Sequence, residues 1–132
     1  MAALLLDITS FLVDNQLAAG DGIDTFRDFV PAQPNDIIML GEYSGDPPHP
    51  VDDAVHRSVQ IACRSTDPDI AHTKAQSIFN LLRAKQSDTL YVQFTVDRWG
   101  QVYLRQLPFK VKIDENDRTY YAFNIGITTT AE

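Results

Sequence analysis

The sequence predicts an α+β domain in which two helices pack on a mostly antiparallel sheet of about five to six strands. Two segments have the apolar spacing of helices, one at the start of the chain and one near its middle. Between and after them, short segments alternate apolar and polar residues, as strands with one buried face do. The chain of 132 residues suffices for one core, so we expect a single domain over residues 1–132.

Both expected helices have a clear apolar face. The first covers about residues 3–18 and stops at the glycines that follow. Its apolar stripe consists of Leu4, Leu5, Ile8, Phe11 and Leu12. In the second, DPDIAHTKAQSIFNLLRAK, Asp67 is a good cap, and Pro68 takes the first helical position, where its missing N–H costs nothing. The buried face of this helix is expected to be Ala71, Ala75, Ile78, Phe79 and Leu82.

The remaining apolar segments are expected to be strands. TFRDFV is a weak edge strand, whereas residues 37–40 in DIIMLGEY form an unbroken apolar run, typical of a strand that is central in the sheet and covered on both faces. RSVQIACRS alternates, with Val59, Ile61 and Cys63 on one face and Arg64 on the other. The last third adds TLYVQFTVD and QVYLRQL, and then FKVKI and TYYAFNIGI, which form a hairpin around the polar turn DENDR.

Charge and cysteine content exclude several classes of protein. The net charge is −7, and the basic residues do not cluster, so nucleic acid would be repelled rather than bound. The single cysteine cannot form an internal disulfide, which suits a reducing compartment. The apolar N-terminus has no basic region before it and is interrupted by Asp7 and Asp14, unlike a signal peptide or a membrane span. We expect a soluble protein made in the cytoplasm.

The sequence contains no recognisable catalytic motif. Glycine-rich phosphate loops, HExxH and nucleophile elbows are all missing. The nearest metal-binding pattern is HPVDDAVH, with His49, Asp52, Asp53 and His56, but its prolines disfavour the helix that would gather these side chains. We therefore favour a solvated loop here, expect no catalytic residue, metal or cofactor, and interpret Cys63 as a small buried side chain.

Two surfaces remain candidates for contacts with other proteins. Two helices cannot cover both faces of such a sheet, and large aromatic side chains are expected on the uncovered face. The loop GEYSGDPPHP follows a buried strand, and its prolines restrict the backbone before binding, which lowers the entropy lost on docking. A surface loop without function is the alternative. The candidate interface residues are Glu42, Tyr43, Asp46, Pro47, Pro48, His49, Asp52, Asp53, Tyr91, Tyr103 and Tyr120.

Four stretches, taken in order, resemble a known family. They are LGEYSGDPP at residues 40–48, RSVQIACRS at 57–65, AHTKAQSIFNLL at 71–82, and PFKVKIDENDRTYYAFNIGI at 108–127. Together they resemble the minor capsid proteins of long-tailed bacteriophages that act as tail terminators, or head–tail joining proteins. None of these stretches is catalytic in that family, so the resemblance carries over no active-site residue.

The resemblance implies a structural role in the virion, at the junction of head and tail. The subunits would form a six-membered ring on the head-proximal end of the tail tube, stop its growth and join it to the head connector. Implied partners are further copies of the chain, the tail tube protein and the connector protein, while the genomic DNA passes through the lumen without specific binding. The alternatives are a head-completion or tail tube protein and, as a weaker one, a small metal-dependent enzyme built around residues 49–56.

Overall fold

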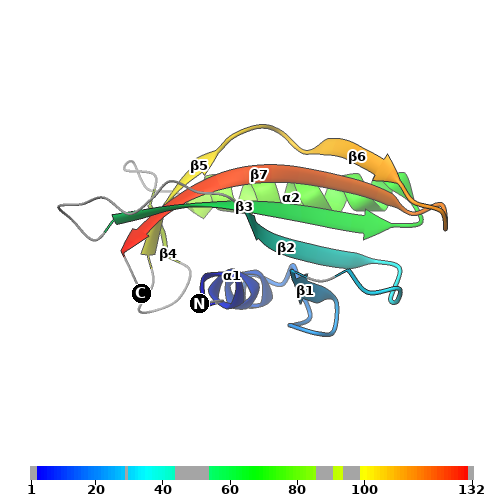
Figure 1. Cartoon of the computed structure of the whole chain (residues 1–132), viewed down its shortest axis with the longest axis horizontal. Coiled ribbons are helices and arrows are strands. Elements are labelled where there is room, and N and C mark those ends of the chain that lie inside the picture. The colour runs from blue at the N-terminus through cyan, green and yellow to red at the C-terminus, as the bar shows by residue number, and fades with distance from the viewer. Residues whose placement is uncertain (1–2, 29, 44–53, 86–90, 94–98, 131–132) are drawn as a thin grey trace.

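The computed structural model describes residues 3–28, 30–43, 54–85, 91–93 and 99–130. Its elements are α1 (Ala3–Asp14), β1 (Thr25–Arg27), β2 (Ile37–Tyr43), β3 (Ala54–Ser65), α2 (Pro68–Lys85), β4 (Tyr91–Gln93), β5 (Trp99–Leu104), β6 (Phe109–Ile113) and β7 (Thr119–Thr130). The predicted α+β class is confirmed, because both helices accompany one mostly antiparallel sheet (Figure 1).

The sheet is built around its two longest strands. Among the described residues it has seven strands in the order β1-β2-β3-β7-β5-β4, with β6 also paired to β7. β3 and β7 are antiparallel and pair over their whole length, from Ala54 with Thr130 to Ser65 with Thr119. β1, the weak edge strand expected in TFRDFV, runs parallel to β2. The expected hairpin is confirmed, since β6 pairs with β7 around the turn at residues 114–117.

α1 ends at Asp14, short of the expected residue 18. The Leu17 amide donates to the Leu12 carbonyl at 2.9 Å, the Gln16 amide donates to that of Val13 at 3.0 Å, and Gln16 has a φ of 63°. This is a Schellman ending with a left-handed residue after the last helical turn. Glycine usually occupies that position, so the sequence pattern placed the end at about residue 18, just before Gly20.

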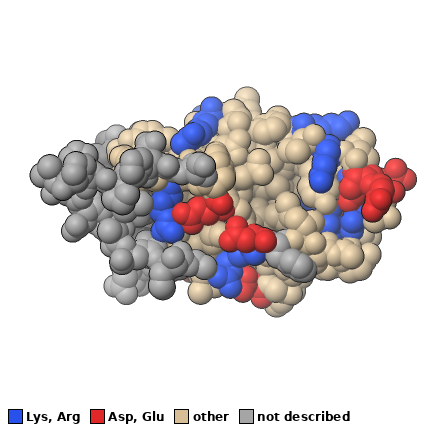
Figure 2. Space-filling view, viewed as in Figure 1, with Lys and Arg blue, Asp and Glu red and all other residues tan. Residues whose placement is uncertain are grey.

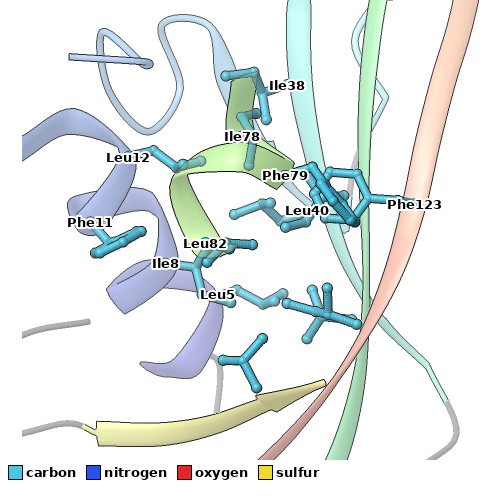
Figure 3. Close-up of a cluster of buried hydrophobic side chains, with 14 of the residues drawn as sticks. Leu5, Ile8, Phe11, Leu12, Ile38, Leu40, Ile78, Phe79, Leu82 and Phe123 are labelled. Carbon is cyan, nitrogen blue, oxygen red and sulfur yellow. The ribbon is translucent and has the colours of Figure 1, made fainter. Parts of the chain in front are cut away.

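Both helices pack on the same face of the sheet, and the core lies between the helices and the sheet (Figure 3). The buried face of α2 consists of the five residues predicted from its spacing. Phe79 of α2 meets Phe123 of β7 edge to face, with ring centroids 5.5 Å apart. Cys63 is also buried in this core, and burial raises the pKa of its thiol to about 12, so it packs as an inert side chain.

β2 is covered on both faces only where it begins. Ile37 and Ile38 point to opposite faces and are both buried, but Met39, on the face away from the helices, is partly exposed. The strand is next to the edge of the sheet, not central as its apolar run suggested. The cover over Ile37 comes from the segment of residues 31–35, which Arg64 fastens to the sheet.

Arg118, which directly precedes β7, also anchors the segment of residues 31–35. Its guanidinium donates to the Ala32 carbonyl and, at 2.9 Å, to the Asp114 carboxylate. Asp114 also accepts the backbone amides of Asn116 and Arg118, each at 3.0 Å. Burial acts to raise the pKa of Asp114, but the hydrogen bonds from these amides and from the Arg118 side chain outweigh it and lower the pKa.

Asp114 should therefore support the fold less well in acid. A carboxyl whose pKa is lower in the folded chain stabilises it above the unfolded pKa of about 3.9, and this contribution is lost as the pH falls through the folded pKa. The difference in unfolding free energy between wild type and Asp114→Asn should shrink between about pH 5 and pH 2. Denaturation curves across that range measure it, with Glu115→Gln on the same turn as the matched charge control. A difference that stays constant with pH would contradict the assignment.

Candidate assembly surface

The broad face of the sheet opposite the helices carries no helix (Figure 1). We call it the open face. Strand register and alternation place on it Met39, Gly41, Tyr43, Ser58, Gln60, Ala62, Arg64, Tyr103, Tyr120, Ala122, Asn124 and Gly126. Seen from this side, Figure 2 shows an uncharged area below basic side chains at the upper margin and above a mixed group of acidic and basic ones.

Two of the predicted aromatic residues are exposed on the open face, and one is not. Tyr43 and Tyr103 keep 44% and 45% of their surface exposed, whereas Tyr120 keeps only 5%. β6 runs beside Tyr120 and sends the Lys112 ammonium over its ring, 4.8 Å from the centroid. The Tyr120 hydroxyl also lies 3.4 Å from the Arg64 guanidinium. Tyr120 thus lies on the open face, but the expectation that it is exposed there is wrong, and this residue belongs to the subunit's own packing.

Glu42 already has a partner within the chain. Its carboxylate accepts two hydrogen bonds from Arg57, at 2.7 and 3.1 Å, across the ends of β2 and β3. This bidentate pair fixes the exit of both strands toward the loop predicted as an interface. Glu42 thus positions the loop's starting point, and both of its carboxylate oxygens are engaged.

The rest of the predicted interface lies outside the described residues. This holds for Asp46, Pro47, Pro48, His49, Asp52 and Asp53, and for the side chain of Tyr91, whose backbone begins β4. Of the four residues in the possible metal pattern, only His56 is described, and its Nδ1 lies 2.7 Å from the Thr128 hydroxyl. Within the described ranges, no three His, Cys, Asp or Glu residues gather closely enough to hold a metal ion.

Arg105 is a feature of the open face that the sequence pattern did not reveal. Its side chain lies across Gly126 and donates to the Ser58 hydroxyl at 3.3 Å. A Cβ added at Gly126 would lie 2.8 Å from the Arg105 Nη2, so with any other residue there the Arg105 side chain would have to shift. A lone glycine inside an apolar strand signals such an approach, and that signal was present in NIGI. Arg105 places a positive charge over the middle of the open face.

One hollow of about 200 Å³ near the start of α2 gathers ionisable groups, including Asp24, Cys63 and Lys74. Each of these has a structural task. The Asp24 carboxylate accepts the amides of Ala19 and Gly20, and the Lys74 ammonium donates to the Leu17 carbonyl at 3.0 Å. The Cys63 thiol is kept neutral by burial. These groups hold the chain that leaves α1 and do not form an acid–base pair.

Comparison with known proteins identifies a family for most of the chain. A family model described as bacteriophage tail terminator protein matches residues 12–131, which include every strand and α2. No curated protein matches the sequence. Neither helix in the described part of the chain is both long and apolar enough to span a bilayer. The resemblance found in the sequence motifs is confirmed, and the protein is a structural component of a phage tail. The chain belongs to the bacteriophage tail terminator family.

Proposed function

We propose that copies of this protein close into a six-membered ring on the head-proximal end of the tail tube. There the ring ends tube growth and joins the tail to the head connector. Family membership supports the tail as its location. The observation that carries the proposal is the open face, where Tyr43 and Tyr103 remain nearly half exposed while both helices cover the opposite side.

A ring requires that different patches of each subunit meet, because a patch that binds itself produces only pairs. The open face and the loop after β2 are the two patches to which we assign these contacts. The acidic composition, with a net charge of −7, suits a lumen through which DNA passes without being bound. Asp46, Asp52 and Asp53 would add to this repulsion if the loop faces the channel.

Removing residues 46–53 should abolish assembly while the subunit stays folded. The described core is formed by residues of the helices and the sheet, so the circular dichroism spectrum should match that of the wild type. Ring formation and capping of tail tubes should be lost, as seen by electron microscopy. As a control, a variant with alanine at Pro47, Pro48 and Pro50 keeps the loop length and should assemble more weakly, because a freer loop loses more entropy on docking. Normal assembly of the deletion variant would contradict the role of the loop.

Sizing the purified protein, alone and with tail tube protein, tests the proposed function itself. Light scattering and electron microscopy should show a species that stays monomeric or stops at one ring, and that ring should bind tube ends. Growth into long stacks would indicate a tube subunit. Binding to the connector but not to tubes would indicate a head-completion protein.

A further inference from the structure

β6 is an edge strand that buries none of its side chains. All five of its residues are exposed, and among the described residues its only paired neighbour is β7. The register shifts between Lys110 and Lys112, so the simple alternation expected from FKVKI does not turn one set of side chains inward. We call the exposed residues here the β6 ridge: Leu107, Phe109, Lys110, Val111, Lys112 and Ile113.

The β6 ridge exposes more apolar surface than is usual for an edge strand that contacts only water. Val111 and Ile113 keep 47% and 53% of their surface exposed, and Leu107 keeps 62%. Lysines and a register shift on an edge strand discourage irregular pairing with other chains. They do not account for four exposed apolar side chains in one place, and such a group indicates a contact surface.

An apolar hollow of about 160 Å³ lies beside β2, near the opposite border of the sheet. We call it the β2 hollow; it is lined by Asp28, Val30, Met39, Leu40, Gly41, Gln60 and Ala62. Water in such a hollow is bound poorly by the apolar part of its lining, and a fitting side chain would displace it favourably.

Asp28 gives the β2 hollow a negative charge. Its carboxylate is exposed and forms no salt bridge with the described residues, since the neighbouring Arg27 pairs with Asp21 at 3.0 Å. The Asp28 amide donates to the Leu40 carbonyl at 2.8 Å, and its φ is 55°, which holds the side chain beside β2. The β6 ridge, in contrast, carries Lys110, which has no ion pair within the same described ranges.

The ridge and the hollow cannot meet within one copy. β3 and β7 lie between β2 and β6, so the two sites are separated by on the order of 14 Å of sheet at the usual strand spacing. A second copy, however, can bring its β6 ridge, which carries the positive charge of Lys110, to the β2 hollow, which carries the negative charge of Asp28. We propose that the β6 ridge of one copy docks in the β2 hollow of the next, with apolar side chains in the hollow and Lys110 toward Asp28.

This contact rests on the proposed ring and specifies how neighbouring subunits join. Because ridge and hollow are different surfaces at opposite borders of the sheet, the contact is head to tail and leaves a free ridge and a free hollow on every pair. Such a pair keeps adding copies until the ring closes. Phe109 is the first candidate to enter the hollow, since its backbone pairs with Ala122 of the open face.

Charge exchange tests the contact. Lys110→Glu, and separately Asp28→Lys, should each lower the yield of rings on tail tubes by about tenfold or more, because like charges would then face each other. Mixing the two variants should restore rings in which they alternate, and a single chain with both changes should assemble alone. The matched control is Asp14→Lys with Lys85→Glu, which makes similar changes at exposed positions on the helices and should assemble normally.

A second variant tests the hollow without changing any charge. Gly41→Val fills it, and the fold should tolerate the change because Gly41 lies in β2 and an added Cβ would come no closer than 3.8 Å to Asp28. Ring yield should fall while the melting temperature stays close to that of the wild type. If wild-type rings form and these variants assemble equally well, the contact is wrong although the ring stands. If the wild type forms no ring, even on tail tubes, the proposed function and the contact both fall.

Discussion

Replacing Phe123 with alanine is expected to lower the free energy of unfolding by about 3–5 kcal/mol. Phe123 is fully buried in the middle of β7, the strand that pairs with β3 on one side and with β5 and β6 on the other. Its ring packs edge to face against Phe79 of α2 at 5.5 Å, so the variant loses both the buried area and the ring contact, and leaves a cavity between helix and sheet. Urea denaturation followed by circular dichroism measures the change.

The exposed Phe109→Ala serves as the control for the Phe123 variant. Removing an exposed ring leaves no cavity, so its effect on stability should stay below about 1 kcal/mol. Phe109→Ala should instead reduce ring yield, which Phe123→Leu, a smaller core change, should spare at temperatures where it is folded. A loss of less than about 1 kcal/mol for Phe123→Ala would mean that α2 does not pack on β7 as described.

Arg64→Met should cost about 3 kcal/mol of unfolding free energy, although arginine is a surface residue in most proteins. Arg64 keeps only 2% of its surface exposed. Its guanidinium donates to the carbonyls of Pro31, Pro34 and Asn35, at 2.8, 2.6 and 3.1 Å. Methionine fills a similar length but has no donor, so three carbonyls lose their partner at once. Urea denaturation again gives the magnitude.

The Arg64 variant should also change assembly, because the fastened segment leads directly from Val30 at the β2 hollow to Ile37 in β2. Hydrogen exchange of residues 31–37 should become faster than that of β3 and β7. Arg64→Lys should be intermediate, since one ammonium cannot reach all three carbonyls with the fork of a guanidinium. Arg105→Met is the matched control, because that side chain is exposed and makes one long hydrogen bond to a side chain. Equal stability of the Arg64 and Arg105 variants would refute the role given to Arg64.

The elements that follow from local patterns were predictable from the sequence. The apolar spacing of α2, its cap at Asp67 and the alternation of β3 depend on neighbours a few residues apart, and the structure matches them. The end of α1 was not predictable in this way, because Gln16 adopts a left-handed conformation that the sequence rules assign to glycine. The coverage of β2 depended on Arg64, whose partners are about thirty positions away along the chain.

The candidate surface was predicted only in outline. The number of helices relative to strands indicated one uncovered sheet face, and Tyr43 and Tyr103 lie on it. Tyr120 could not be placed from alternation, because its burial depends on β6 pairing alongside it and on Lys112 crossing its ring. The exposure of all five β6 residues could not be predicted either. It accompanies a register shift between Lys110 and Lys112, and an alternating sequence does not indicate such a shift.

The complete pairing of β3 with β7 has a mechanical consequence for a protein of the tail. A force along these strands is shared by the hydrogen bonds of all the residue pairs from Ala54–Thr130 to Ser65–Thr119, whereas a force across the sheet would separate them in turn. The subunit is therefore stiffest along this one direction and most compliant at its borders. In the proposed ring, tension would strain the contacts between neighbouring subunits before it deforms the body of any subunit.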